Sequence, residues 1–268
     1  MKHTPVLSAS NIVAGYDKKI ILNGVDMVIP RNRISVIIGA NACGKSTLLK
    51  TLARLIQPVS GEVSIDGKRL GAIPPKQLAR ILGLLPQSPV VPEGITVADL
   101  VSRGRFPYQN FLKGMGKQDY KAVEEALELM GITALANCSV DELSGGQRQR
   151  VWIAMALAQD TDILLLDEPT TFLDITYQIE ILDLLTDLNR KKGTTIVMVL
   201  HDINLAVRYA DYLFAVQDGA LVAQGPPSGI LNEALMKQVF GLDCMVTKDP
   251  VSGLPFVVPM GRYHVNAT

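Results

Sequence analysis

Several features that mark other protein classes are scarce in this chain of 268 residues. Its three cysteines, Cys43, Cys138 and Cys244, are an odd number without CxxC spacing, which disfavours a disulfide framework or a zinc site. Lysine plus arginine equals aspartate plus glutamate, at 26 each, so no overall charge favours nucleic acid or anionic lipid. We therefore expect no nucleic-acid partner, and a reducing, cytoplasmic environment.

Long apolar runs are also lacking, although 48% of the residues are hydrophobic. The longest runs, such as 34–38 and 163–166, are far shorter than the roughly 20 residues that a membrane-spanning helix needs. We therefore expect no membrane span, and such runs are typical of buried parallel strands. No continuous apolar stretch precedes Asn11, so we expect no secretory signal there.

Short apolar strands and helical stretches alternate along the rest of the chain. The predicted strands are 7–14, 25–30, 34–38, 62–65, 81–85, 163–166, 195–200 and 213–216, and the predicted helices are 45–55, 97–103, 119–130, 145–158, 177–191 and 230–240. Strands joined by helical crossovers predict an α/β fold with a parallel sheet. The helical stretch from 96 to about 159 predicts a lobe inserted into that core.

Residues 39–46, Gly-Ala-Asn-Ala-Cys-Gly-Lys-Ser, match the pattern GxxxxGK[ST] between a predicted strand and a predicted helix. Such a turn aims backbone N–H groups at one point, and the helix adds its positive N-terminal end. Lys45 can reach β- and γ-phosphate oxygens, and the Ser46 hydroxyl can bind Mg²⁺. The alternative is a glycine loop that merely turns the chain. The predicted phosphate-binding residues are Gly39, Ala40, Asn41, Ala42, Cys43, Gly44, Lys45, Ser46 and Thr47.

Two positions of this turn depart from the common pattern. Ala42 stands where many such loops have a third glycine, and Ala40 where proline is frequent. A Cβ at residue 42 is costly if its φ is positive. Our hypothesis is that residue 42 keeps an allowed negative φ and that the loop still binds ATP. The neighbouring Cys43 is either a small side chain that fills the loop or a redox-sensitive thiol.

The apolar run 163–166 ends in two acids, Asp167 and Glu168. A buried strand would deliver Asp167 to the carboxyl edge of the sheet, where it can hold Mg²⁺ through a water molecule. Glu168 would then lie beside the γ-phosphate, placed to polarise the attacking water. The alternative is that this acid pair caps the next helix.

Residues 143–147, Leu-Ser-Gly-Gly-Gln, place a serine and two glycines at the start of a predicted helix, which makes a second anion site. Both sites can serve one nucleotide only if the second comes from a partner subunit. With this string the sequence resembles the ATP-binding-cassette (ABC) ATPases, in which the pentapeptide contacts the γ-phosphate bound by the opposite protomer. The resemblance therefore implies that Ser144, Gly145, Gly146 and Gln147 bind the partner's ATP; a plain serine-capped helix is the alternative.

The resemblance gives roles to four further residues, each with an ordinary structural alternative. Tyr16 resembles the aromatic residue that stacks on adenine, but it could be a packing tyrosine. Gln87 resembles the glutamine that senses Mg²⁺ and links the core to the helical lobe, but alone it is an unremarkable loop residue. Asp174 matches the acid that bridges protomers, or it caps a helix that begins at Ile175. His201 resembles the histidine that hydrogen-bonds the γ-phosphate, or it is a structural strand-end histidine.

The resemblance covers roughly residues 5–240 and implies the family's fold and activity. It implies a P-loop NTPase (RecA-like) core at 5–90 and 160–240 with a parallel sheet, an N-terminal antiparallel β-subdomain and an inserted α-helical subdomain at about 91–159. A C-terminal tail would follow at 241–268. The implied activity is ATP hydrolysis, with catalytic residues Glu168, His201 and Gln87 and with Mg²⁺ held by Ser46, Gln87 and Asp167.

Partners also follow from the resemblance. One phosphate-binding turn and no expected membrane span imply a homodimer that works with separate integral-membrane permease subunits, and indirectly with a substrate-binding protein. Such a dimer would lie peripherally on the cytoplasmic face of the cell (inner) membrane. Residues 95–99, 103–110 and 200–211 resemble those of ATPases from ferric-siderophore importers. Family members dock a permease helix after Gln87; otherwise 103–110 is an ordinary solvated loop.

Other functions stay open at this stage. Related importers carry haem or cobalamin, so an ATPase subunit for haem or cobalamin import is the alternative transport function. A translation or resistance factor would usually fuse two cassettes, and a DNA-repair ATPase would insert a long coiled coil, whereas this chain has one motif set and no long heptad stretch. A regulator that does not hydrolyse ATP would be favoured if Glu168 proved dispensable.

Overall fold

The computed structural model describes residues 6–17, 19–87, 93–109, 114–171 and 173–261. The expected domain start at residue 5, the loop residue Asn110 and the tail positions 262–268 lie outside these ranges. The strands are β1 Leu7–Tyr16, β2 Lys19–Val28, β3 Ile34–Ile38, β4 Ser60–Ile65, β5 Lys68–Arg69, β6 Leu82–Leu85, β7 Ile163–Asp167, β8 Thr195–Val199, β9 Tyr212–Gln217, β10 Ala220–Gly225, β11 Cys244–Lys248 and β12 Pro255–Pro259.

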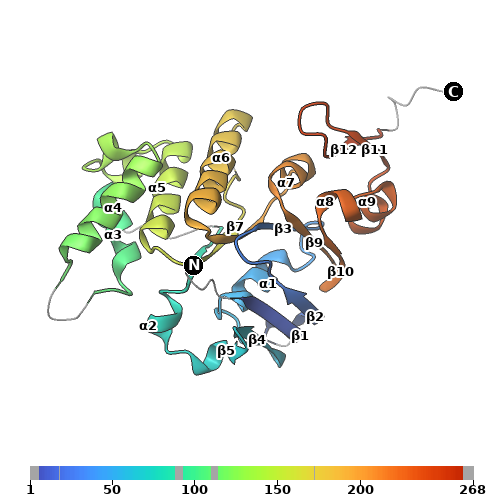
Figure 1. Cartoon of the computed structure of the whole chain (residues 1–268), viewed down its shortest axis with the longest axis horizontal. Coiled ribbons are helices and arrows are strands. Elements are labelled where there is room, and N and C mark those ends of the chain that lie inside the picture. Colours follow the sequence, from blue (N-terminus) through green and yellow to red (C-terminus); the bar gives the residue numbers. More distant parts are fainter. Residues whose placement is uncertain (1–5, 18, 88–92, 110–113, 172, 262–268) are drawn as a thin grey trace.

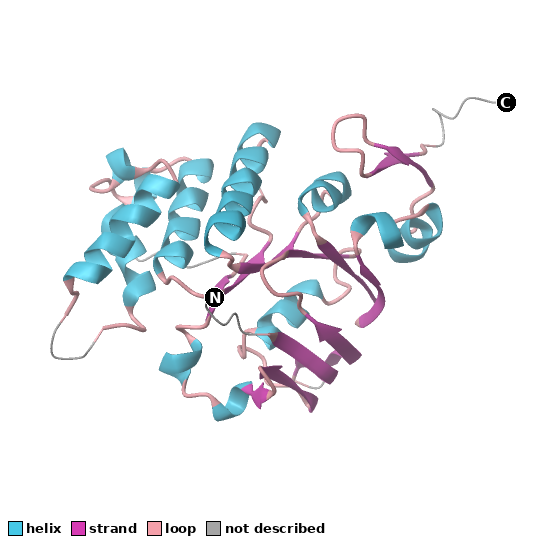
Figure 2. Cartoon of the chain, viewed as in Figure 1, coloured by secondary structure: helices cyan, strands magenta, loops and turns pink. Residues whose placement is uncertain are grey.

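Helices account for a large share of the remaining described chain (Figure 2). They are α1 Lys45–Leu52, α2 Pro75–Leu78, α3 Val97–Ser102, α4 Lys117–Leu129, α5 Gly145–Ala158, α6 Ile175–Lys192, α7 Ile203–Tyr209, α8 Pro227–Ile230 and α9 Glu233–Phe240, with short 3₁₀ turns at Leu70–Ala72, Arg103–Arg105, Thr133–Leu135 and Val140–Glu142. Among the described residues no helix combines the length and apolar character needed to cross a bilayer.

A six-stranded sheet in the order β10-β9-β3-β8-β7-β6 forms the centre of the molecule (Figure 1). All its neighbours pair in parallel except β10, which pairs antiparallel with β9. Every residue of β3, β7 and β8 is buried, because both faces of this sheet are covered. The predicted parallel core is therefore confirmed.

A second, antiparallel sheet of order β2-β1-β4-β5 lies across the central helix α1 from the six-stranded sheet (Figure 1). Leu48, Leu49 and Leu52 of α1 are fully buried in one cluster with residues of both sheets. This cluster fixes α1, and thus the turn that precedes it, between the two sheets. The implied N-terminal antiparallel subdomain is confirmed.

The helical lobe is built from α3, α4 and α5, and it is continuous with the buried cluster on the other face of the central sheet. Arg105 ties the lobe together: this buried guanidinium pairs with Asp119 of α4 at 2.9 Å and donates to the carbonyl of Ala158 at 2.7 Å. Tyr108 stacks on Arg105, with 3.9 Å from the ring centre to the guanidinium carbon. The start of the loop 103–109 is therefore anchored.

The C-terminal segment contains structure that the sequence did not predict. β11 and β12 form an antiparallel hairpin, and β12 packs against α7. Val257 of β12 and Cys244 of β11 are buried in the main hydrophobic cluster. This hairpin therefore belongs to the packed core.

Candidate functional site

Four parallel strands deliver the predicted catalytic residues to one edge of the sheet. β3 leads into the turn at 39–44, β6 is followed by Gln87, β7 ends at Asp167 and β8 is followed two residues later by His201. Because β3, β8, β7 and β6 are adjacent and parallel, their carboxyl ends lie side by side. A cavity of about 590 Å³ opens there, lined by Lys19, Ile21, Asn41, Ala42, Gly44, Lys45, Ser46, Thr47, Gln87, Glu168, Thr171 and His201.

The turn before α1 has the form of an anion cradle. Gly44, the N-cap of α1, has φ 109°, and a Cβ on Gly39 would overlap the carbonyl oxygen of Val216. Glycine is therefore required at both positions. The Lys45 ammonium donates to the carbonyls of Gly39 at 2.8 Å and Ala40 at 2.7 Å. An ammonium group held in this way can exchange its bonds to the two carbonyls for bonds to phosphate oxygens that enter the cavity.

The hypothesis of a negative φ at Ala42 is wrong. This residue has φ 61°, in the left-handed region. The chain must reverse direction between β3 and α1, and the geometry of this turn overrides the local preference of alanine. Ala42 nevertheless lines the cavity, as predicted.

A second turn is hydrogen-bonded to the phosphate-binding turn. Gly219, between β9 and β10, donates its N–H to the carbonyl of Cys43 at 3.0 Å and accepts the N–H of Asn23 at 2.9 Å. Cys43 itself is buried, and this burial raises the pKa of its thiol. Because a thiolate is the reactive species, the structure favours the loop-filling interpretation of Cys43 over a redox-sensitive thiol.

Ser46 lines the cavity, and with the adjacent Asp167 it could hold a cation. Ser46 Oγ donates to Oδ1 of Asp167 at 3.0 Å. The other carboxylate oxygen, Oδ2, is buried and has no hydrogen-bond partner. Desolvation by burial raises the pKa of Asp167, although the bond from Ser46 acts in the opposite direction. A buried carboxylate oxygen without a partner beside a hydroxyl fits the oxygen ligands that Mg²⁺ prefers.

The carboxylate of Glu168 contacts the side chains of the other two predicted catalytic residues. Its Oε1 lies 2.6 Å from Nε2 of His201, and its Oε2 accepts from Nε2 of Gln87 at 2.5 Å. The carboxylate is buried, and the residue has φ 56°, a strained value for a glutamate. Thr171, which the sequence did not single out, also donates to Oε2 at 3.1 Å. In the sequence, the signal that could have identified this residue is a threonine three residues after the second acid of the pair.

The pentapeptide 143–147 begins α5 as predicted, but it does not line this cavity. Ser144 caps the helix: its hydroxyl accepts the N–H of Gln147 at 3.3 Å, and its own N–H donates to the Gln147 side chain at 3.0 Å. Ser144, Gly145 and Gln147 are exposed. The two elements that the sequence predicted to bind phosphate are therefore separated within one chain.

Two predicted residues lie at the periphery. Tyr16 is 48% exposed at the end of β1, which leaves its ring free to stack on a base. Asp174 caps α6, since its Oδ1 accepts the N–H of Tyr177 at 3.1 Å, and it is exposed. The capping role of Asp174 is thus observed; a bridging role stays a prediction.

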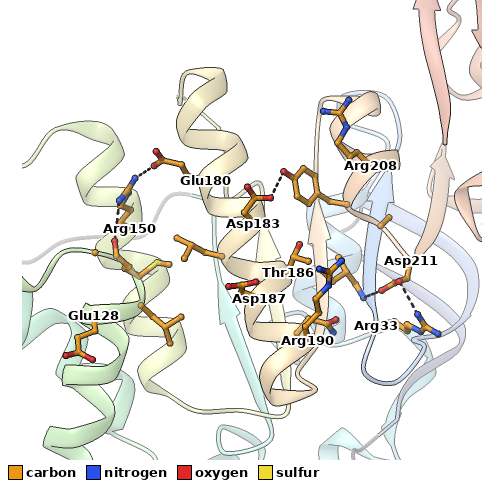
Figure 3. A pocket seen from close by; sticks show the side chains of 18 of the residues that line it. Arg33, Glu128, Arg150, Glu180, Asp183, Thr186, Asp187, Arg190, Arg208 and Asp211 are labelled. Carbon is orange, nitrogen blue, oxygen red and sulfur yellow. Dashed lines mark hydrogen bonds and ion pairs between the residues drawn. The ribbon is translucent and has the colours of Figure 1, made fainter. Parts of the chain in front are cut away.

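A larger cavity of about 1210 Å³ lies elsewhere, between α4, α5, α6 and α7 (Figure 3). None of the predicted site residues lines it, and its walls carry charges of both signs, including Arg150 beside Glu180 and Arg33 beside Asp211. Among the described residues, the phosphate turn and Glu168 line the smaller cavity together, which makes it the candidate nucleotide site.

Comparisons with known proteins agree with this geometry. The model of the ABC transporter family matches residues 22–171. The achromobactin transport ATP-binding protein CbrD of Dickeya dadantii (strain 3937) is 52% identical over 96% of this chain and 95% of its own length. The ferric enterobactin transport ATP-binding protein FepC of Escherichia coli (strain K12) is 50% identical over 96% of this chain and 94% of its own.

Solved structures show the same architecture. An ABC transporter described as of metal-chelate type, in an inward-facing conformation, matches with a TM-score of 0.84 at 28% identity over 97% of this chain and 100% of that chain. The dimeric cassette MJ0796, in a post-hydrolysis state bound to ADP and Pi, matches with a TM-score of 0.72 at 30% identity over 82% of this chain and 98% of that chain. The chain therefore belongs to the ABC transporter family and carries its ATP-binding ATPase cassette.

Proposed function

We propose that this protein is the ATP-hydrolysing subunit of an importer that takes up an iron–siderophore complex through separate membrane permease subunits. The observation that carries the proposal is the contact of Glu168 with both His201 and Gln87 beside the phosphate turn. The siderophore class is supported by two relatives at about half identity, whose names specify achromobactin and ferric enterobactin transport.

The residues of the cavity would have the following roles in hydrolysis. The N–H groups of the turn and the Lys45 ammonium bind the phosphates, and the positive end of α1 adds to their field. Ser46 and the free oxygen of Asp167 would hold Mg²⁺, which would neutralise charge developing on the phosphate oxygens. Glu168 then accepts a proton from the attacking water, while His201 donates a hydrogen bond to the γ-phosphate.

ATP would be enclosed between two copies of the chain. The Ser144 helix end is exposed and lies away from its own chain's cavity, so it is free to complete the site of a second copy. MJ0796, the cassette with ADP and Pi, is dimeric. Bound phosphates would close this dimer, and hydrolysis would remove the bridge and reopen it.

The permease would bind at the exposed side of the loop 103–109. Phe106 is 64% exposed there, whereas its neighbours Arg105 and Tyr108 are fixed to α4, α5 and each other. An exposed aromatic residue on an anchored turn is a suitable docking element for an apolar helix. In this arrangement the protein lies on the cytoplasmic face of the membrane, and a substrate-binding protein delivers the chelate to the permease.

Gene deletion tests the transport function. The deletion strain should fail to grow on at least one ferric siderophore as the sole iron source. Wild-type protein should restore growth, and a Glu168→Gln variant should not. Normal uptake of every siderophore combined with loss of haem or cobalamin uptake would contradict the substrate class and leave the ATPase assignment intact. Purified protein without Mg²⁺-dependent ATP hydrolysis would contradict the enzymatic assignment.

A further inference from the structure

The helix that begins beside His201 is held by the C-terminal hairpin. α7 starts two residues after this histidine, and its N-cap Asp202 accepts the N–H of Leu205 at 2.9 Å. The side chain of His201 is 47% exposed, so the packing of the imidazole contributes little to its placement. Its position beside Glu168 therefore depends on where the chain enters α7.

Asn204, in the first turn of α7, makes two hydrogen bonds to one residue of β12. Its Oδ1 accepts the N–H of Val257 at 2.8 Å, and its Nδ2 donates to the carbonyl of Val257 at 3.1 Å. Val257 is fully buried in the main cluster. An amide bound at both ends to the backbone of a buried strand fixes the rotation of the helix turn that carries it.

One turn later, Arg208 makes a second link to the same hairpin. Its guanidinium pairs with the buried carboxylate of Asp249 at 2.7 Å. Asp249 also organises the hairpin turn, because it accepts the N–H of Val251 and the hydroxyl of Ser252, each at 2.9 Å. The bond from Arg208 and these two bonds hold the pKa of Asp249 below its ordinary value. Asn204 and Arg208 are four residues apart and so share one face of α7.

The end of α7 is also linked to α6. The hydroxyl of Tyr209 donates to Oδ1 of Asp183 at 2.8 Å across the larger cavity, where Figure 3 shows Asp183 pointing toward α7. Burial and this bond raise the pKa of Tyr209 to about 12. α7 also packs into the main hydrophobic cluster through the buried residues Leu205, Ala206 and Val207. Of its three polar links, to the hairpin at Asn204 and Arg208 and to α6 at Tyr209, the Asn204 contact lies nearest to His201 in the chain.

We propose that Asn204 is a positioning residue for His201, through which the C-terminal hairpin sets the distance between the imidazole and Glu168. The inference rests on the proposed function, because the placement of His201 affects the rate only if His201 takes part in ATP hydrolysis. Loss of the two bonds to Val257 removes the polar restraint on the start of α7 and leaves only its apolar packing and its cap, so that the imidazole spends less time within hydrogen-bond reach of Glu168 and the γ-phosphate.

A double-mutant cycle with His201 tests the proposal. The variants are Asn204→Ala, His201→Ala and the double variant, each measured for kcat, for ATP affinity at equilibrium and for Tm. We expect Asn204→Ala to lower kcat about threefold to tenfold with unchanged ATP affinity. In the His201→Ala background the same change should lower kcat by less than about 1.5-fold. Lys237→Ala, which removes an exposed pair with Asp243 near the hairpin, is the control and should leave kcat unchanged.

An equal loss of kcat in both backgrounds would overturn the proposal, because a general structural effect does not depend on His201. No loss in the single variant would overturn it as well. Should Asn204→Ala fail to fold, Arg208→Met removes the second link and is expected to lower kcat in the same direction, again only when His201 is present. A wild-type protein without ATP hydrolysis would instead overturn the proposed function, and this inference with it.

Discussion

The carboxylate of Glu168 lies between two side chains from the segments that follow β6 and β8, with Oε1 2.6 Å from Nε2 of His201 and Oε2 2.5 Å from Nε2 of Gln87. These contacts hold the carboxylate in place in spite of the strained φ of 56° at this residue. If Glu168 is the general base, as we propose, these contacts orient its carboxylate before water attacks. The predictions below test this residue and the elements around it.

Replacing Glu168 by Gln should slow ATP hydrolysis by roughly 10²–10⁴, because an amide cannot accept the proton. ATP binding should persist, and the variant should elute as a dimer in the presence of Mg-ATP. Phosphate release and size-exclusion chromatography measure the two effects. The matched control is Glu62→Gln, an exposed residue that pairs with Arg69, and it should behave as wild type. Normal turnover by Glu168→Gln would contradict the assigned role.

Asp167→Asn should stabilise the free protein while it weakens Mg-ATP binding. The folded pKa of Asp167 is raised, so folding disfavours its ionised form, and this destabilisation is present above the folded pKa and disappears as the pH falls below the unfolded value. At neutral pH an amide removes the buried charge, and we expect Tm to rise by about 2–4 °C. Thermal unfolding and ATP titrations with and without Mg²⁺ measure both effects. A lower Tm with unchanged Mg-ATP affinity would refute this account.

Ala42→Gly should stabilise the protein by about 0.5 kcal/mol, because glycine adopts a positive φ without the steric penalty of a Cβ. ATP affinity should be equal or higher. Ala40→Gly is the control: Ala40 lies in the same turn but is not among the described residues with positive φ. It should destabilise by about 0.5–1 kcal/mol through the added freedom of the unfolded chain. Urea unfolding distinguishes the pair, and equal effects would show that the left-handed geometry at residue 42 carries no strain.

Gly219→Ala should weaken ATP binding, although Gly219 is not one of the residues that line the cavity. An added Cβ would overlap the carbonyl oxygen of Ile21 and displace the turn that bonds Cys43. Gly67 has a similar φ, 75° against 78°, but a Cβ there meets nothing within 4 Å. Gly67→Ala should therefore lose only about 1 kcal/mol of stability and keep its ATP affinity. Equal ATP affinities for the two variants would rule out support of the phosphate turn by Gly219.

Sequence patterns predicted the centre of the fold well because its signals are local. Ile34–Ile38 and Gly145–Ala158 occur at the predicted bounds, since the first is an unbroken buried run and the second begins at a serine cap. The motifs that follow the strands, together with the family resemblance, predicted that Lys45, Glu168 and His201 act on one nucleotide, and all three line the same cavity.

Elements that depend on distant contacts were missed or misplaced. β2 runs over Lys19–Val28, whereas the predicted strand was 25–30. Its first half is extended by pairing with β1, where Lys19, Ile20 and Leu22 lie opposite residues of that strand. The hairpin of β11 and β12 depends on contacts of Asp249 with Arg208 and of Val257 with Asn204, and these hairpin residues are remote in sequence from α7. At Ala42 the geometry of the whole turn decided the φ, against the residue's own preference.

The central claim is that one ATP is bound between the phosphate turn of one chain and the Ser144 helix end of another. Mixing two defective variants, Lys45→Ala and Ser144→Arg, tests it most directly. A dimer of one copy of each would have one site with both defects and one intact site made from the unaltered Ser144 of the first chain and the unaltered Lys45 of the second. In a Glu168→Gln background the account predicts that the mixture retains ATP through gel filtration, whereas neither variant does alone. A mixture that retains no more ATP than its separate components would contradict the account.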